Sequence, residues 1–198
     1  QLSAGSSPAG MLEQFLGVKH DDTRFKVTTG TGKLNVVNNF RYAVANGNWD
    51  NTATWSATSG GSPGASVPVA GDAVFIAEAA TARTVTITNG YSAACTLVTI
   101  GTIADNTVGT LNFATASSSL TVSGNVTMNR PSAGATSTIG LGAGSMTVNG
   151  NLELAHWTTS STKNDRLNTI TVSTGTLTVS GNLIFGAEQV LQSQIVFS

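Results

Sequence analysis

The chain has 198 residues, of which 10% are charged, and its formal net charge at pH 7 is −1. Only nine residues are Lys or Arg, which excludes nucleic-acid binding by phosphate neutralisation, because that mode needs a basic stripe. No apolar run reaches the roughly 18 residues of a membrane-spanning helix, and one cysteine, Cys95, cannot form an intrachain disulfide or a Cys-based zinc site.

The first 70 residues lack the pattern of the rest of the chain, and residues 56–68 are rich in Gly and Ser. We expect residues 1–70 to form an N-terminal cap or assembly segment that ends in a loop. A solenoid needs such a cover because its first coil otherwise exposes unpaired backbone and apolar core.

From residue 73 onward, apolar and polar residues alternate in short runs that are typical of β-strands. We expect residues 71–198 to form a parallel β-helix of about four coils with three strands each. The expected strands are 73–79, 83–90 and 96–101; 109–116, 119–122 and 126–129; 137–142, 145–148 and 152–155; and 168–173, 176–179 and 183–186.

One phrase occurs three times, as SLTVSGNVTMN, SMTVNGNLELA and TLTVSGNLIFG, and its Gly-Asn pairs begin 26 and then 31 residues apart. Such spacing is typical of solenoids. We expect Asn125, Asn151 and Asn182 to occupy equivalent corners and to form a hydrogen-bonded ladder, with a ligand site as the alternative. The corner glycines are expected to supply a positive φ.

The segment 156–168 lengthens the third coil and gathers charge and aromatic character that the repeats avoid. We interpret it as a candidate recognition loop for a glycan or a protein partner, because loops that project from a solenoid often carry binding residues. The alternative is a solvated loop with local ion pairs. The candidate residues are His156, Trp157, Lys163, Asp165 and Arg166.

The C-terminal SQIVFS resembles the strand NTITVS of the preceding coil. We expect Ile195, Val196 and Phe197 to form either the start of a further coil or a strand that pairs with another subunit. Pairing would give a head-to-tail contact that propagates into a filament.

Three stretches, GNWDNTATWS, VPVAGDAVFI and TVTITNGYSAACTLVTIG, resemble a pattern of bacterial and phage surface proteins with T-L-T-V-S-G-N-L repeats. The resemblance spans about residues 45–186 and implies a right-handed parallel β-helix with adhesive, structural or glycan-related roles. It also implies that Trp49 and Trp55 pack over the first coil and that Asp72 bonds backbone at its start. Sugar stacking on an exposed tryptophan is the alternative.

Enzyme chemistry finds little support in the residues. A glycosidase needs two carboxylates across the sugar, yet Glu153 is the one acid within a repeat phrase, and Thr127 and Ile184 hold its equivalent places. The acids and histidine of residues 20–22 are adjacent, and adjacent residues rarely converge on one metal ion. We therefore expect no catalytic residue, no cofactor and no metal.

These patterns predict a non-enzymatic structural or adhesive protein, outside the cell or on its surface, that assembles end to end with copies of itself. A glycan or host surface is the further partner considered. One alternative is a carbohydrate-binding or polysaccharide-degrading β-helix, and another is a phage virion fibre or decoration protein. The chain opens at Gln1, which fits removal of an export signal.

Overall fold

The computed structural model describes residues 39–79, 81–102, 107–129, 136–156, 167–186 and 193–198. The chain divides into two units, residues 1–39 and 40–198, and the fold described below is that of the second unit. The cap expected over residues 1–70 stays a prediction, because residues 1–38 lie outside the described part.

The second unit is built from strands in three sheets, and the one helical element among the described residues is the short 3-10 helix η1 (Thr52–Thr54). Sheet 1 has the order β16 (Leu183–Phe185), β13 (Leu152–His156), β10 (Val126–Asn129), β7 (Leu97–Ile100), β4 (Ala73–Ile76), β1 (Phe40–Ala43) and β3 (Trp55–Ser56). Sheet 2 has the order β17 (Gln194–Phe197), β14 (Leu167–Val172), β11 (Thr136–Gly142), β8 (Gly109–Phe113), β5 (Arg83–Ile87) and β2 (Gly47–Asn48). Sheet 3 has the order β15 (Thr176–Val179), β12 (Ser145–Val148), β9 (Ser119–Val122) and β6 (Ser92–Cys95).

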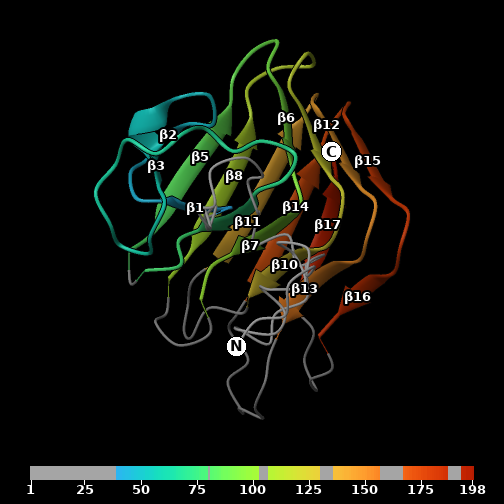
Figure 1. Ribbon diagram of the computed structural model, residues 1–198. Helices are drawn as coiled ribbons and strands as arrows, with labels where there is room; N and C mark the ends of the chain where they lie inside the picture. The colour runs from blue at the N-terminus through green and yellow to red at the C-terminus, as the bar shows by residue number, and fades with distance from the viewer. Residues whose placement is uncertain (1–38, 80, 103–106, 130–135, 157–166, 187–192) are drawn as a thin grey trace, which may run out of the picture. The chain divides into compact units, whose positions relative to one another are not determined.

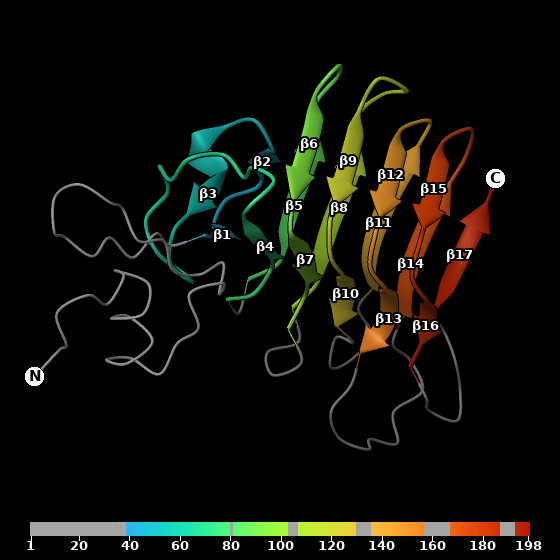
Figure 2. The same ribbon diagram turned by 45° about the vertical axis from the view of Figure 1, so that its right-hand side comes forward.

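The chain visits the three sheets in a fixed cyclic order, and each visit to all three makes one coil. Successive coils are β4-β5-β6, β7-β8-β9, β10-β11-β12 and β13-β14-β15. Strands of successive coils pair in parallel, as the row β5, β8, β11, β14, β17 in Figure 1 and the row β6, β9, β12, β15 in Figure 2 illustrate. The expected all-β parallel solenoid is thus confirmed, while its right-handedness stays a prediction.

The first coil differs from the expected grouping. Residues 73–79 and 96–101 were expected in one coil, whereas β4 lies directly beside β7 in sheet 1, with Val74 opposite Val98. The strand of sheet 3 in that coil is β6, which was not predicted from the sequence. Its inward residues are small, Ala93 and Cys95, so its sequence lacks the large β-branched and aromatic residues that reveal a strand.

The core consists of columns of inward side chains that stack from coil to coil. One column of sheet 1 contains Val74, Val98, Val126 and Leu152, and the next contains Ile76, Ile100, Met128 and Leu154. All eight side chains are 0% exposed. Full burial of one such side chain contributes about 1.5–3 kcal/mol, so the stacking of coils supplies the main stabilisation of the fold.

The corner glycines serve close approach rather than the positive φ that was expected. Among the described glycines, Gly60, Gly64, Gly90, Gly101 and Gly142 have positive φ, and the repeat glycines Gly124, Gly150 and Gly181 do not. A Cβ added at Gly150 would lie 2.6 Å from the Gly124 carbonyl carbon and oxygen. For the repeat glycines the expectation was wrong, because the backbones of successive coils, and not the bend itself, leave no room for a side chain. It holds at the Asn-Gly corner of Gly90, which has a positive φ.

Strands of the solenoid begin before the boundary expected at residue 70. The strand β1 pairs in parallel with β4, and β2 pairs in parallel with β5. The strand β3 instead runs antiparallel to β1, with Ala43 opposite Trp55. Residues 40–56 therefore contribute the first strands of sheets 1 and 2.

Candidate functional site

Acidic residues in the described part of the chain lie apart from one another. Glu153 lies on the outer face of sheet 1 in register with Thr127 on one side and Ile184 on the other, as expected from the repeat. Asp50 accepts a hydrogen bond from Thr88 Oγ1 at 3.1 Å. Within the described residues, no group of three or more His, Cys, Asp or Glu side chains is placed to hold a metal ion.

The three repeat asparagines form the ladder that their spacing indicated. The side-chain oxygen of Asn125 accepts from the backbone N–H of Asn151 at 2.8 Å, and that of Asn151 accepts from the N–H of Asn182 at 2.9 Å. The amide oxygens of Asn125 and Asn151 thus each satisfy a backbone donor in the next coil. This arrangement gives the asparagines a structural task at the corner.

At the start of the solenoid, two tryptophans fill the space that an earlier coil would occupy. Trp49 and Trp55 are both 0% exposed, and their rings meet edge to face with centroids 5.3 Å apart. Trp55 Nε1 donates to the backbone oxygen of Trp49 at 2.8 Å. Neither indole can stack on a sugar while it is buried.

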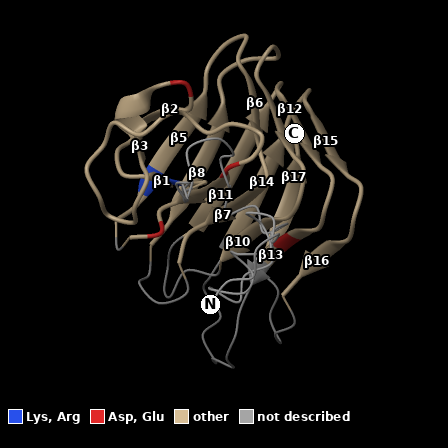
Figure 3. Ribbon diagram, in the orientation of Figure 1, with Lys and Arg blue, Asp and Glu red and all other residues tan. Residues whose placement is uncertain are grey.

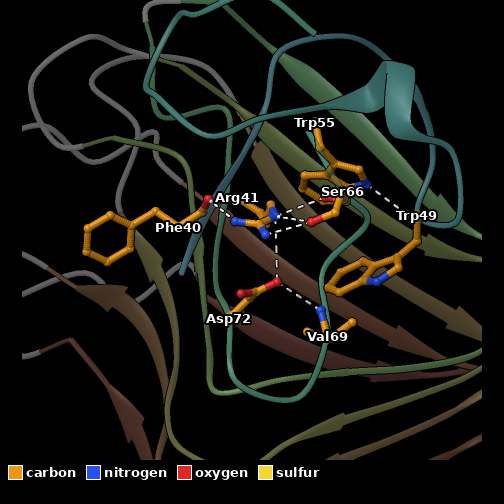
Figure 4. Close-up of polar contacts among 7 residues, drawn as sticks. All are labelled: Phe40, Arg41, Trp49, Trp55, Ser66, Val69 and Asp72. Carbon is orange, nitrogen blue, oxygen red and sulfur yellow. Dashed lines mark hydrogen bonds and ion pairs between the residues drawn. The ribbon is translucent and has the colours of Figure 1, made fainter. Parts of the chain in front are cut away.

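An ion pair fastens the loop that precedes β4 beside these rings (Figure 4). The Arg41 guanidinium donates to the Ser66 hydroxyl at 2.6 Å and to the Ser66 carbonyl at 2.9 Å. Arg41 Nε lies 3.6 Å from the Asp72 carboxylate, which also accepts from the Val69 N–H at 3.0 Å. Figure 4 shows these groups converging from β1 and from the loop.

The same loop also contributes to the core, since Ala65 and Val67 pack against it. We call β1, β2, β3 and residues 57–72 together the closed end of the solenoid. The inward side chains of this end are covered: Ala43 is 7% exposed and Trp55 is 0% exposed.

The opposite end has no such cover among the described residues. We call β15, β16 and β17, the last strands of the three sheets, the open edge. In β16, Leu183 is 44% exposed and Phe185 is 38% exposed, although their register partners Leu152 and Leu154 are 0% exposed. In β17, Phe197 is 76% exposed, and its partner Val172 is 3% exposed. Core positions of the repeat are therefore uncovered at this edge.

Charge is scarce on the sheets, as the nearly uniform tan of Figure 3 shows. From residue 84 onward, the one charged residue in the described ranges is Glu153. The sequence from 167 to 186, which includes β15 and β16, contains no Lys, Arg, Asp or Glu. The open edge is consequently an uncharged apolar surface.

A cluster of three aromatic rings lies on the outer face of sheet 1 near its start. Tyr42 stacks on Phe75 with centroids 4.9 Å apart, and Phe40 meets Phe75 edge-on at 5.9 Å. All three are half-buried. Partial burial, and secondarily the charge of Glu78, raise the pKa of the Tyr42 hydroxyl, so that it stays a neutral hydrogen-bonding group.

Cys95 is a buried free thiol in β6. Burial, and secondarily the charge of Asp72, raise its pKa to about 12. Because the thiolate is the reactive form, this cysteine is a poor nucleophile at neutral pH. Cys95 is therefore a small residue of the hydrophobic core.

Most of the predicted recognition loop, with Trp157, Lys163, Asp165 and Arg166, lies outside the described residues, as do residues 20–22. His156 is the last residue of β13. The predicted assembly residues Ile195, Val196 and Phe197 all lie in β17, at the open edge.

Two features of the described strands were not predicted from the sequence. One is the exposure of Leu183 and Phe185 in β16, and the other is the cluster of Phe40, Tyr42 and Phe75, which spans two strands. The alternation in FRYA and in AVFI marks the outward positions of those rings. Their side-by-side placement required the register of β1 and β4.

No helix in the described ranges has the length and apolar character to cross a membrane. Comparisons with protein-family models, with curated proteins and with solved structures find no match to this chain. The resemblance to bacterial and phage surface proteins accordingly remains an expectation from the repeat phrases.

Proposed function

We propose that this chain is a non-enzymatic structural or adhesive protein that associates with copies of itself through the open edge. The observation that carries this proposal is the exposure of Leu183, Phe185 and Phe197 at positions whose counterparts in the preceding coil are buried. When a matching surface covers an apolar side chain at such a position, the free energy of the system falls.

Two physical terms favour association at this edge. Complete burial of a Leu or Phe side chain contributes about 1.5–3 kcal/mol, and several such side chains lie together here. Among the described residues, no further strand pairs with the outer side of β15, β16 or β17, and an added strand can satisfy the N–H and C=O groups of that side. Both terms act on the same surface, so a partner that continues the sheets gains from both.

The outward faces support a structural or adhesive task rather than catalysis. On sheet 3, outward positions in register carry the hydroxyl side chains Ser92, Ser119, Ser145 and Thr176. These columns of hydroxyl groups keep the outer face of sheet 3 polar and hydrated without adding charge. Together with the low charge of the sequence, they favour a location outside the cell or on its surface, with a virion as the alternative.

Self-association is tested by light scattering and negative-stain microscopy of the full chain over a range of concentrations. The wild-type chain is expected to grow in mass with concentration. The double variant Leu183→Lys, Phe185→Lys is expected to stay monomeric, since it places charge on exposed side chains of the open edge.

Val69→Lys is the matched control, because Val69 is a 58% exposed apolar residue of the closed end. We expect it to associate like the wild type. A wild-type chain that remains monomeric at every concentration would contradict the proposal.

The second candidate function is glycan binding, and the aromatic cluster of Phe40, Tyr42 and Phe75 favours it. Stacked rings offer apolar faces to a sugar, and the Tyr42 hydroxyl adds a hydrogen-bonding group. This cluster replaces the tryptophans as the candidate platform, since Trp49 and Trp55 are buried.

A glycan array tests this candidate, with Tyr42→Ala as the variant and Phe197→Ala as the control at the other end of the solenoid. Binding that is lost in the first and kept in the second supports a glycan platform. Absence of wild-type binding, or equal binding by both variants, rejects it.

A further inference from the structure

The two ends of the solenoid offer different strand edges. At the closed end, sheet 1 finishes with β3 and sheet 2 with β2, each of two residues, while sheet 3 finishes with the four-residue β6. The strand β3 is also antiparallel to its neighbour. At the open edge, β15 and β17 have four residues each and β16 has three.

The apolar surfaces of the two ends differ as well. A head-to-tail contact would bring Leu183, Phe185 and Phe197 against the closed end. There, Trp49 and Trp55 already fill the core and the Arg41–Asp72 pair fastens the loop over it. Insertion of further side chains would have to displace this packing, so the closed end is a poor receptor for the open edge.

A second open edge, in contrast, presents the same uncovered core positions. Under a twofold rotation about an axis normal to sheet 1, β16 would meet β16 of the second copy in an antiparallel pair. Leu183 would then lie opposite the second copy's Phe185, and both would face the shared core. The rotation also exchanges sheets 2 and 3, so that β15 would meet β17, a strand of equal length.

Charge does not oppose this arrangement. A twofold contact brings each residue near its own counterpart or near residues of the same patch, so a charged patch would repel itself. The sequence from 167 to 186 has no charged residue, and β17 has none either. The open edge is therefore self-compatible, whereas a partner that recognises charge would find nothing to pair with.

We propose that the open edge binds the open edge of a second copy of this chain about a twofold axis, and that assembly therefore stops at two chains. This inference rests on the proposed self-association, and it replaces the head-to-tail filament with a closed pair. An isologous contact uses the same patch on both chains, so neither open edge is left free for a third chain.

Cysteine cross-linking tests the geometry directly. Ile184 lies at the centre of β16 and points outward at 37% exposure, so antiparallel pairing of β16 with itself places the two Ile184 residues opposite each other. Opposed residues in antiparallel strands have Cα atoms about 4.5–5.5 Å apart, which suits a disulfide. Ile184→Cys, made with Cys95→Ala, is expected to give a disulfide-linked dimer under mild oxidation.

The control is Val69→Cys in the same background, which is expected to stay uncross-linked at the same concentration. Sedimentation of the wild-type chain should reach the mass of two chains and no more. Fibres or a continuing rise in mass would overturn the twofold pair while leaving self-association standing. Monomers at all concentrations would overturn both, and a dimer in which Ile184→Cys does not cross-link would overturn the proposed geometry.

Discussion

The closed end and the open edge are built from the same kind of coil, yet one buries its last core layer and the other exposes it. Trp55 at the closed end is 0% exposed, and Phe197 at the open edge is 76% exposed. Both residues are large aromatics at the limit of the stacked core. The difference is that an antiparallel strand and a fastened loop cover the closed end. A repeat thus specifies the body of a solenoid, and residues outside the repeat decide what each end can bind.

The sharpest way to break this comparison is to truncate one aromatic side chain at each end. Trp55→Ala is expected to lower the free energy of unfolding by about 3–5 kcal/mol, because a buried aromatic leaves a cavity. Phe197→Ala is expected to change it by less than about 0.5 kcal/mol, as for other exposed positions. Urea unfolding at low protein concentration measures both, and equal losses would contradict the asymmetry.

Adding a methyl group at the repeat glycines tests how closely the backbones of successive coils approach each other. Gly150→Ala is expected to cost about 1–3 kcal/mol or more, because the new Cβ would lie 2.6 Å from the Gly124 backbone. Gly181→Ala meets the Gly150 oxygen at 2.5 Å, yet we expect a smaller cost, since the last coil can shift outward.

Gly71 supplies the control for these substitutions. It lies in the closed end, its Cβ position has no heavy atom within 4 Å, and its φ is not positive. Gly71→Ala is expected to be neutral or slightly stabilising. Thermal unfolding measures all three variants, and a Gly71→Ala loss as large as that of Gly150→Ala would contradict the close-approach argument.

Removal of one hydrogen bond of the asparagine ladder is expected to lower the stability by less than the glycine substitutions do. Asn151→Ala removes the acceptor for the Asn182 N–H, and we expect a loss of about 0.5–1.5 kcal/mol. Asn182→Ala is the matched control, because Asn182 belongs to the last described corner, where its side chain is exposed. Denaturant titration compares them. Equal losses at both positions would show that the ladder hydrogen bond contributes nothing.

The titration of Cys95 is expected to have the smallest effect on stability at neutral pH, because its thiol is protonated there in both the folded and the unfolded chain. Its folded pKa of about 12 lies above the 9.0 of an ordinary cysteine thiol, so this contribution to stability is complete below about pH 9 and is lost as the pH rises toward 12. Unfolding midpoints from pH 7 to pH 11 measure this decline in the wild type and in Cys95→Ala. A decline of the same steepness in both would contradict the assignment to Cys95.

The sequence was sufficient for the solenoid because its strands repeat at corners marked by Gly and Asn. The inward columns and the Asn125–Asn151–Asn182 ladder follow from that repeat alone. The strand β6 escaped prediction because Ala93 and Cys95 are small, and a weak alternation does not distinguish a strand from a loop. The role of Gly150 was misjudged because a glycine at a corner looks the same whether bend or neighbouring backbone requires it.

The ends were harder to predict for a different physical reason. Burial of Leu183 or Phe185 depends on what stacks above them, which local sequence does not state. Trp49 and Trp55 were expected to pack over the first coil, and both are buried, but the Arg41–Asp72 ion pair beside them joins segments far apart in the sequence. Candidate binding surfaces therefore emerged from the register of strands and not from the repeat.

The most direct test of the account is hydrogen exchange, measured by mass spectrometry, on the full chain at low and high protein concentration. We expect amides of β15, β16 and β17 to exchange more slowly at high concentration, because a second copy pairs with them, and amides of β1 to β4 to exchange at the same rate. Slower exchange at both ends would indicate head-to-tail stacking, and no change at the open edge would contradict the claim that this edge binds another chain.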